Sequence, residues 1–163
     1  SSASLGTSRT FNKYKKSLED HQIPLNQNWI FDAGGSSYRH GYEITEKMIP
    51  IISEIDAIQY STDDIAIGGM LCLKEHGIHI PEDISIAGKG NIPESNFISP
   101  SLTTSGATKE AYLFYEGLVH YLILMIEKSD EYAAISMQLA HFLSHFNSEE
   151  QLIIRESVKK SIF

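Results

Sequence analysis

The chain has 163 residues and a formal net charge of -8, and its size suits one domain with a hydrophobic core of its own. A single cysteine excludes a disulfide framework and favours a reducing compartment, so we expect a cytoplasmic protein. The balance of 13 basic and 21 acidic residues gives no basic surface for DNA phosphates, and no apolar run is long enough for a membrane span.

Strands and helices are expected to alternate along the first part of the chain. The apolar spacing predicts three helices, over 8–20, 38–52 and 65–76. Pro50 should kink or end the second of them. Short apolar runs predict three strands, over 29–31, 55–60 and 84–87. Since such alternation favours right-handed crossovers, we predict an α/β fold, a three-layer parallel sheet with helices on both faces.

The helix over 65–76 has the clearest end signals. Its cap is Ser61 or Thr62, either of which can accept a hydrogen bond from a free backbone N–H. The two aspartates that follow lie in the positive first turn of the helix. Gly77 can take the left-handed conformation that ends it.

The second part of the chain is more helical. After an extended run at 102–104, the pattern predicts an apolar helix over 108–127, a further helix over 134–146 and a last strand over 151–155. The apolar residues of the first of these helices cover most of its circumference. Such a helix needs partners on more than one side.

Signals for metal or catalytic chemistry are weak. His141 and His145 stand four apart, but no glutamate of the metalloprotease motif lies between them, so a structural role is favoured. Cys72 lies between two leucines, where a small buried side chain is the default. We find no phosphate-binding glycine motif, and no nucleophile, base and orienting group together. The sequence therefore predicts no enzyme, no metal and no cofactor.

Polar or glycine-rich segments follow each of the predicted strands. The glycine pair at 34–35 follows the first strand, Asp63 the second, and the segment 88–90 the third. Ligands of open parallel sheets bind beyond the carboxyl ends of the strands, so these segments indicate a ligand site at one rim. A plain helix cap at Asp63 and plain turns at the glycines are the alternatives.

The stretch DAIQYSTDDIAIGGMLCLKEHGIHIPEDISIAGKGN, at 56–91, is followed by SPSLTTS and, near the end, by LIIRES. It resembles the effector-binding core of the LacI/GalR family of bacterial transcription regulators. The family implies a dimeric, two-lobed, periplasmic-binding-protein-like sensor with a small effector in its cleft. On this resemblance, residues 1–163 form a single effector-binding and dimerisation domain, the second lobe with its crossover segments. In the family, the helix within 106–128 packs on a first lobe, which, like the DNA-binding helix-turn-helix, lies outside this chain. Without that partner, we expect the helix to fold onto another face or to pair with a second copy of the chain.

The resemblance also implies site residues. Effector-binding positions fall on Arg9, Thr10, Ser36, Thr62, Asp63, Lys89 and Gly90, and dimer-interface positions on Met70, Leu71 and Leu73. Several sugar-binding side chains of the family are replaced here, so a neutral sugar in the usual pose is not expected. Lys89 and Arg9, with the glycine amides, suit an anionic effector such as a sugar phosphate. A copy that keeps only dimerisation is the alternative.

The expected function is therefore the ligand-sensing and dimerisation part of a transcriptional regulator, a repressor of carbohydrate-related genes. Its expected partners are a sugar or sugar phosphate, a second copy of the chain, and DNA through the helix-turn-helix alone. The alternative from another class is a free-standing solute-binding protein of the same fold.

Overall fold

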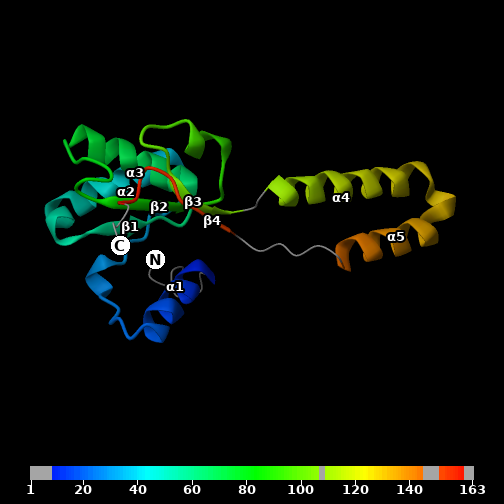
Figure 1. The fold of residues 1–163 in the computed structure, drawn as a ribbon, viewed down its shortest axis with the longest axis horizontal. Helices are drawn as coiled ribbons and strands as arrows, with labels where there is room; N and C mark the ends of the chain where they lie inside the picture. The colour runs from blue at the N-terminus through cyan, green and yellow to red at the C-terminus, as the bar shows by residue number, and fades with distance from the viewer. Residues whose placement is uncertain (1–8, 107–108, 145–150, 160–163) are drawn as a thin grey trace. The chain divides into compact units, whose positions relative to one another are not determined.

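The computed structural model describes residues 9–106, 109–144 and 151–159, and the chain forms two compact units (Figure 1). Unit 1 consists of Ser1–Thr104 and Ile154–Phe163, and unit 2 of Ser105–Ile153. Unit 2 is therefore inserted into the sequence of unit 1. That residues 1–163 act as one effector-binding domain stays a prediction.

Unit 1 alternates helices and strands. Its helices are α1 (Arg9–Asp20), α2 (Tyr38–Met48) and α3 (Asp63–Glu75), and its strands are β1 (Ala57–Gln59), β2 (Ser85–Lys89) and the start of β3 (Thr103–Gly106). The first two strands pair in parallel, with Ile58 opposite Ile86, and α3 is the crossover between them. The sheet has the order β1-β2-β3-β4, where β4 is Gln151–Ile153. The predicted α/β class is confirmed.

The ends of α3 follow the local signals. Thr62, not Ser61, is the cap, and its Oγ1 accepts a hydrogen bond of 3.3 Å from the N–H of Ile65. Gly77 follows the helix with a φ of 73°, which a residue with a Cβ rarely adopts. α2 also ends as expected, because a 3-10 helix (Ile49–Glu54) with a proline in its first turn replaces the α-helix.

The buried strand predicted over 29–31 is wrong. Gln27–Trp29 is a turn of 3-10 helix, and the side chain of Asn26 accepts a hydrogen bond of 3.0 Å from the N–H of Asn28. Trp29 is 47% exposed. Such a local bond from asparagine competes with strand pairing. Ile30 is extended, residues 31–33 have no regular secondary structure, and no strand precedes β1 among the described residues.

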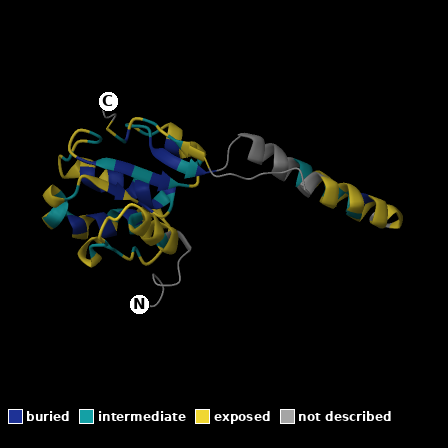
Figure 2. Cartoon of the chain, turned by 60° about the horizontal axis from the view of Figure 1, so that its bottom comes forward, coloured by how far each residue is buried: buried dark blue, intermediate teal, exposed yellow. Residues whose placement is uncertain are grey.

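The core of unit 1 lies between α2, α3 and one face of the sheet (Figure 2). Two glycines bring the helices close together: a Cβ on Gly41 would collide with the carbonyl oxygen of Ile65, and one on Gly68 with that of Tyr38. The buried core residues are Ile44, Met48, Ile58, Tyr60, Ile65, Ala66, Met70, Leu73, Ile84, Ile86 and Leu102.

Most of unit 2 is a helical hairpin. α4 (Lys109–Glu127) packs against α5 (Tyr132–Ser144) across the short 3-10 helix Ser129–Glu131 (Figure 1). Both helices were predicted, although positions 145–146 of the second prediction lie outside the described residues, and the last strand is shorter than predicted. Among the side chains of α4 that the structure describes, the exposed apolar ones are Val119, Leu122, Ile123 and Ile126. None of the helices in the described ranges has the length and apolar character needed to span a bilayer.

Candidate functional site

The rim predicted at the strand ends forms around Asp63. Because β1 and β2 are parallel, the segments that follow them leave the sheet at the same edge. A Cβ added to Gly88 would collide with Oδ1 of Asp63, and one added to Gly90 would lie 3.7 Å from Oδ2. The structure therefore brings the second and third predicted segments together.

Asp63 is the organising residue of this rim. It is fully buried, and Oδ1 accepts a hydrogen bond of 2.6 Å from the hydroxyl of Thr104, while Oδ2 accepts one of 3.0 Å from the N–H of Ile92. The effector contact assigned to Asp63 stays a prediction, and in this conformation the carboxylate has no exposed surface with which to touch a ligand. It fixes the surrounding backbone instead.

Glycine is required beside this carboxylate for steric reasons. At Gly88 any side chain would enter the space of Asp63. Gly90 has a φ of 132° and Asn91 a φ of 54°, both of which are conformations that favour glycine or asparagine. The backbone thus turns tightly over the buried carboxylate, and Lys89 is carried at the rim, half-buried at the end of β2.

The sequence did not identify Arg155 as a site residue. Its guanidinium donates from Nη1 to Oγ of Ser95 at 2.9 Å and to the carbonyl oxygen of Leu102 at 2.7 Å. Nη2 donates to Oδ1 of Asn91 at 2.8 Å. A single arginine in the apolar run LIIRES was the available signal. Arg155 therefore holds the rim turn through Asn91, Ser95 and Leu102.

Ser157 fastens the same C-terminal segment to the sheet. This fully buried residue accepts from the N–H of Ile86 through its carbonyl, and its hydroxyl donates to the carbonyl of Ile86, each at 2.7 Å. The N–H of Thr103 in turn donates to that hydroxyl at 2.7 Å. Ser157 thereby joins the C-terminal segment to β2 at Ile86 and to β3 at Thr103.

The remaining predicted effector residues are distributed as follows. Thr62 is half-buried, and its Oγ1 caps α3. Gly90 and Ser36 are exposed, the latter in the loop before α2. Arg9 and Thr10 begin α1, but their side chains lie outside the described residues. Thr62, Lys89 and Gly90 thus stay effector candidates around the buried Asp63.

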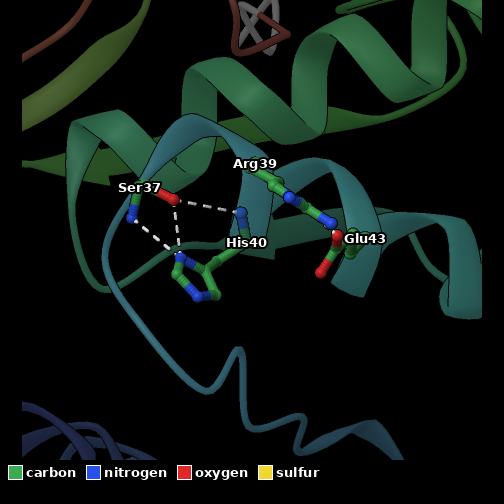
Figure 3. A network of polar contacts seen from close by, with 4 residues as sticks. All are labelled: Ser37, Arg39, His40 and Glu43. Carbon is green, nitrogen blue, oxygen red and sulfur yellow. Dashed lines mark hydrogen bonds and ion pairs between the residues drawn. The ribbon is translucent and has the colours of Figure 1, made fainter.

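The loop that carries Ser36 is held by a capping box at the start of α2 (Figure 3). Oγ of Ser37 accepts from the N–H of His40 at 3.4 Å and lies 2.6 Å from Nδ1 of that ring, which also accepts from the N–H of Ser37. A Cβ on Gly35 would fall inside the space of the imidazole. The polar pair caps the helix. Arg39, in the same first turn, forms a surface ion pair with Glu43 one turn on, and this hydrogen bond lowers the pKa of the Glu43 carboxyl.

The dimer-interface assignment stays a prediction, and its three residues differ in exposure. Met70 is only 6% exposed and Leu73 not at all, because both face the core. Leu71 points the other way and is 51% exposed. Together with Tyr38 and Tyr42 it lines a shallow hollow between α2 and α3.

Among the described residues, Sγ of Cys72 lies 3.8 Å from Nδ1 of His76, and both residues have structural surroundings. Burial raises the pKa of Cys72, which keeps it a thiol, and His76 binds the carbonyl oxygen of Cys72 at the helix end, as expected. His141 is exposed, and His145 lies outside the described residues. Within the described residues no three His, Cys, Asp or Glu side chains lie together as metal ligands.

A family model described as a periplasmic binding protein-like domain matches residues 3–111. Since this is more than half of the sequence, the chain belongs to the periplasmic-binding-protein-like domain family. The resemblance to LacI/GalR regulators is confirmed by the relatives that follow, which are transcriptional regulators and not enzymes.

The relatives cover the chain well but extend far beyond it. The chain is 31% identical over 147 residues to the transcriptional repressor PurR of Pasteurella multocida, a match covering 90% of this chain and 40% of the relative. It is 41% identical over 93 residues to the transcriptional regulator RegA of Clostridium acetobutylicum, covering 56% of this chain and 27% of the relative. The chain therefore spans less than half the length of these curated relatives.

Solved structures agree in fold. A sugar-binding transcriptional regulator of the LacI family from Escherichia coli, complexed with phosphate, is similar with a TM-score of 0.63 and 25% identity, over 93% of this chain and 51% of that chain. A LacI-type regulator from Bifidobacterium animalis subsp. lactis is similar with a TM-score of 0.65 and 24% identity, over 90% of this chain and 48% of that chain.

Proposed function

We propose that the chain is the effector-sensing and dimerisation part of a LacI/GalR-type transcriptional repressor that acts in the cytoplasm on carbohydrate-related genes. The observation that carries this proposal is the rim in which parallel strand ends meet around Asp63, in a chain whose relatives are regulators. DNA is bound by the helix-turn-helix of the longer protein, since the acidic chain has no basic surface of its own.

The proposed effector is anionic, with a sugar phosphate as the first candidate. Lys89 supplies the positive charge at the end of β2, beside the tight turn at Gly90. The N–H groups that follow in this turn, those of Asn91 and Ile92, hold it in place by donating to Thr104 and Asp63. Thr62 supplies a hydroxyl for a neutral part of the ligand. One solved neighbour is a sugar-binding regulator complexed with phosphate, which supports this class.

Thermal unfolding tests the effector. A ligand that binds only the folded state raises the midpoint as its concentration rises. Glucose 6-phosphate is expected to raise the midpoint by several degrees, and glucose or inorganic phosphate alone by less. Lys89→Ala should abolish the shift, whereas Lys74→Ala, which removes an exposed lysine of α3, should keep it. Equal shifts with glucose, or a shift that survives Lys89→Ala, would contradict an anionic effector at this rim.

The proposed dimer surface is the outer side of α2 and α3 around Leu71. The exposed Leu71 and Tyr38 form an apolar patch, flanked by the ion pair of Arg39 and Glu43. A charge placed at the centre of an interface is strongly unfavourable. Light scattering should give a dimer mass for the chain and a monomer mass for Leu71→Glu. Phe97→Glu, at a residue that is 83% exposed, is the control that should stay dimeric.

The exposed stripe of α4 has a proposed partner as well. Val119, Leu122 and Ile126 recur at three and four residues, the spacing of one helix face. We propose that this face packs on the first lobe of the longer regulator. Hydrogen exchange of α4 should then be slower in the longer protein than in this chain, and equal exchange in both would refute the proposal.

A further inference from the structure

The turn that follows β2 has an unusual backbone. Gly90 has a φ of 132° and Asn91 a φ of 54°, and the left-handed conformation of a residue with a Cβ costs free energy. Contacts with the rest of the fold must offset this cost. Lys89, the cation of the proposed effector site, directly precedes the turn, so its position depends on those contacts.

The side chain of Asn91 is one point at which the turn is held. Its Oδ1 accepts a hydrogen bond of 2.8 Å from Nη2 of Arg155. The N–H of the same residue donates to Oγ1 of Thr104 at 3.3 Å. The left-handed residue is therefore fixed both through its backbone and through its side chain.

Arg155 reaches the next residue of the turn by a second route. Nη1 donates to Oγ of the fully buried Ser95 at 2.9 Å, and that hydroxyl donates to the carbonyl oxygen of Ile92 at 2.6 Å. A charged donor strengthens its own hydrogen bond and polarises the hydroxyl that follows. One guanidinium thus acts on two consecutive residues of the turn.

Arg155 is itself anchored to buried parts of the sheet. Nη1 also donates to the carbonyl oxygen of Leu102 at 2.7 Å, and the N–H of Arg155 donates to Oγ1 of Thr103 at 2.8 Å. Both of these partners are buried. The arginine therefore connects the turn to the start of β3 and not to a surface loop.

The chemistry of these bonds favours arginine over lysine. The acceptors of the guanidinium are a hydroxyl, a carbonyl and an amide oxygen, all of them neutral. Directional hydrogen bonds from two nitrogens in one plane hold the turn, and the single nitrogen of an ammonium group cannot reproduce them.

We propose that Arg155 is a positioning residue for the effector. It does not touch the ligand, and it sets the affinity of the rim by holding Lys89 and Gly90 in place through Asn91 and Ser95. This inference rests on the anionic effector proposed above, and it adds a residue that determines how tightly this effector binds.

Two variants separate geometry from charge. Arg155→Lys keeps the positive charge and loses the planar donors, whereas Lys159→Ala removes an exposed charge from the same segment and keeps the donors. The dissociation constant for glucose 6-phosphate is measured by calorimetry where circular dichroism shows both variants folded. Arg155→Lys should raise it by about tenfold, and Lys159→Ala by less than about twofold at physiological salt.

Asn91→Gly tests the link from Arg155 to the turn. Glycine adopts the same positive φ without strain, so this variant removes the Oδ1 acceptor and leaves the backbone conformation accessible. It should also weaken binding of glucose 6-phosphate. If both residues act through one hydrogen bond, the double variant Arg155→Lys, Asn91→Gly should lose clearly less than the product of the two single effects.

A dissociation constant in Arg155→Lys that equals the parent value, a loss in Lys159→Ala as large as in Arg155→Lys, or fully multiplicative effects in the double variant would overturn the proposal. If the parent chain does not bind glucose 6-phosphate, the proposed effector fails, and hydrogen exchange decides on Arg155. Faster exchange at the N–H groups of Asn91 and Ile92 in Arg155→Lys would support its hold on the turn, and unchanged exchange would refute it.

Discussion

The hydroxyl of Thr104 donates a hydrogen bond of 2.6 Å to the buried carboxylate of Asp63, across 41 residues of sequence. With the bond from the N–H of Ile92, it joins β3 and the rim turn to the first turn of α3. Removing this carboxylate leaves two donors without an acceptor. Asp63→Ala should therefore lower the free energy of unfolding by about 2–4 kcal/mol, measured by urea denaturation.

Matched amide variants separate this role from a general effect of charge at the helix start. Asp63→Asn directs an amide N–H₂ group at one of two donors and should still cost about 1–3 kcal/mol. Asp64, in the same helical turn, is only half-buried, and Asp64→Asn should change the free energy of unfolding by less than about 1 kcal/mol. Similar values for the two variants would contradict the structural role of Asp63.

Gly88→Ala should destabilise the fold through a steric clash. Its Cβ would collide with Oδ1 of Asp63 and approach Cδ2 of Leu102 to 3.0 Å, and overpacking of this kind costs about 1–3 kcal/mol. In the Asp63→Ala background the substitution should cost less, because the main obstacle is gone. A double-mutant cycle by urea denaturation gives the coupling, and additive effects would show that the carboxylate is not the obstacle.

Arg155→Ala should loosen the rim turn as well as destabilise the fold. The guanidinium makes the bonds to Ser95, Leu102 and Asn91 described above, and its loss should lower the free energy of unfolding by about 2–4 kcal/mol. Arg155→Lys should recover only part of the lost free energy of unfolding, because an ammonium group cannot reproduce the planar arrangement of N–H donors of the guanidinium. Hydrogen exchange at 88–92 should rise in both variants.

The control for Arg155 is its exposed neighbour Lys159, whose replacement by alanine should leave that exchange unchanged. Full recovery by Arg155→Lys would show that charge alone is needed, contrary to the geometry.

Alkaline pH should destabilise the protein through Tyr60. Burial raises the pKa of Tyr60 from 10.0 to about 12. The neutral Tyr60 contributes fully to the free energy of unfolding at pH values below 10.0, the pKa of the tyrosine in the unfolded chain. This contribution is lost as pH rises from 10.0 to about 12, because the unfolded chain releases its phenolic proton first. The total loss is about 2–3 kcal/mol.

Tyr60→Phe provides the comparison. The variant loses the hydrogen bond to Thr45 at every pH but cannot release a proton. The difference in free energy of unfolding between the parent chain and Tyr60→Phe, measured by urea denaturation, should therefore shrink by about 2 kcal/mol between about pH 9 and pH 11.5. A disadvantage that stays constant over this window would mean that Tyr60 titrates normally.

Local signals predicted the fold well, because they act over a few residues. The cap at Thr62, the stop at Gly77 and the break after Met48 are backbone effects that the sequence displays directly. The failed strand at 29–31 shows the limit of this approach. Its apolar residues suit a strand, but Asn26 forms a local bond that starts a helical turn instead.

The candidate site was predicted less completely, since its contacts join distant segments. Arg155 meets its three partners across 53, 60 and 64 residues, and no periodicity predicts such pairs. Asp63 was identified, but the pattern did not show that its oxygens would be used internally. The burial of Met70 and Leu73 follows from the phase of α3, which is apolar on several sides and therefore ambiguous in sequence.

The N–H of Arg155 donates to Oγ1 of Thr103 at 2.8 Å, so the chain returns to unit 1 beside the point at which it left. An inserted segment whose two ends lie close together in the folded scaffold adds little loop-closure entropy to the cost of folding. An experimenter can therefore excise the hairpin of α4 and α5 with a short glycine-serine bridge, while β1, β2 and the segment around Arg155 keep their hydrogen bonds.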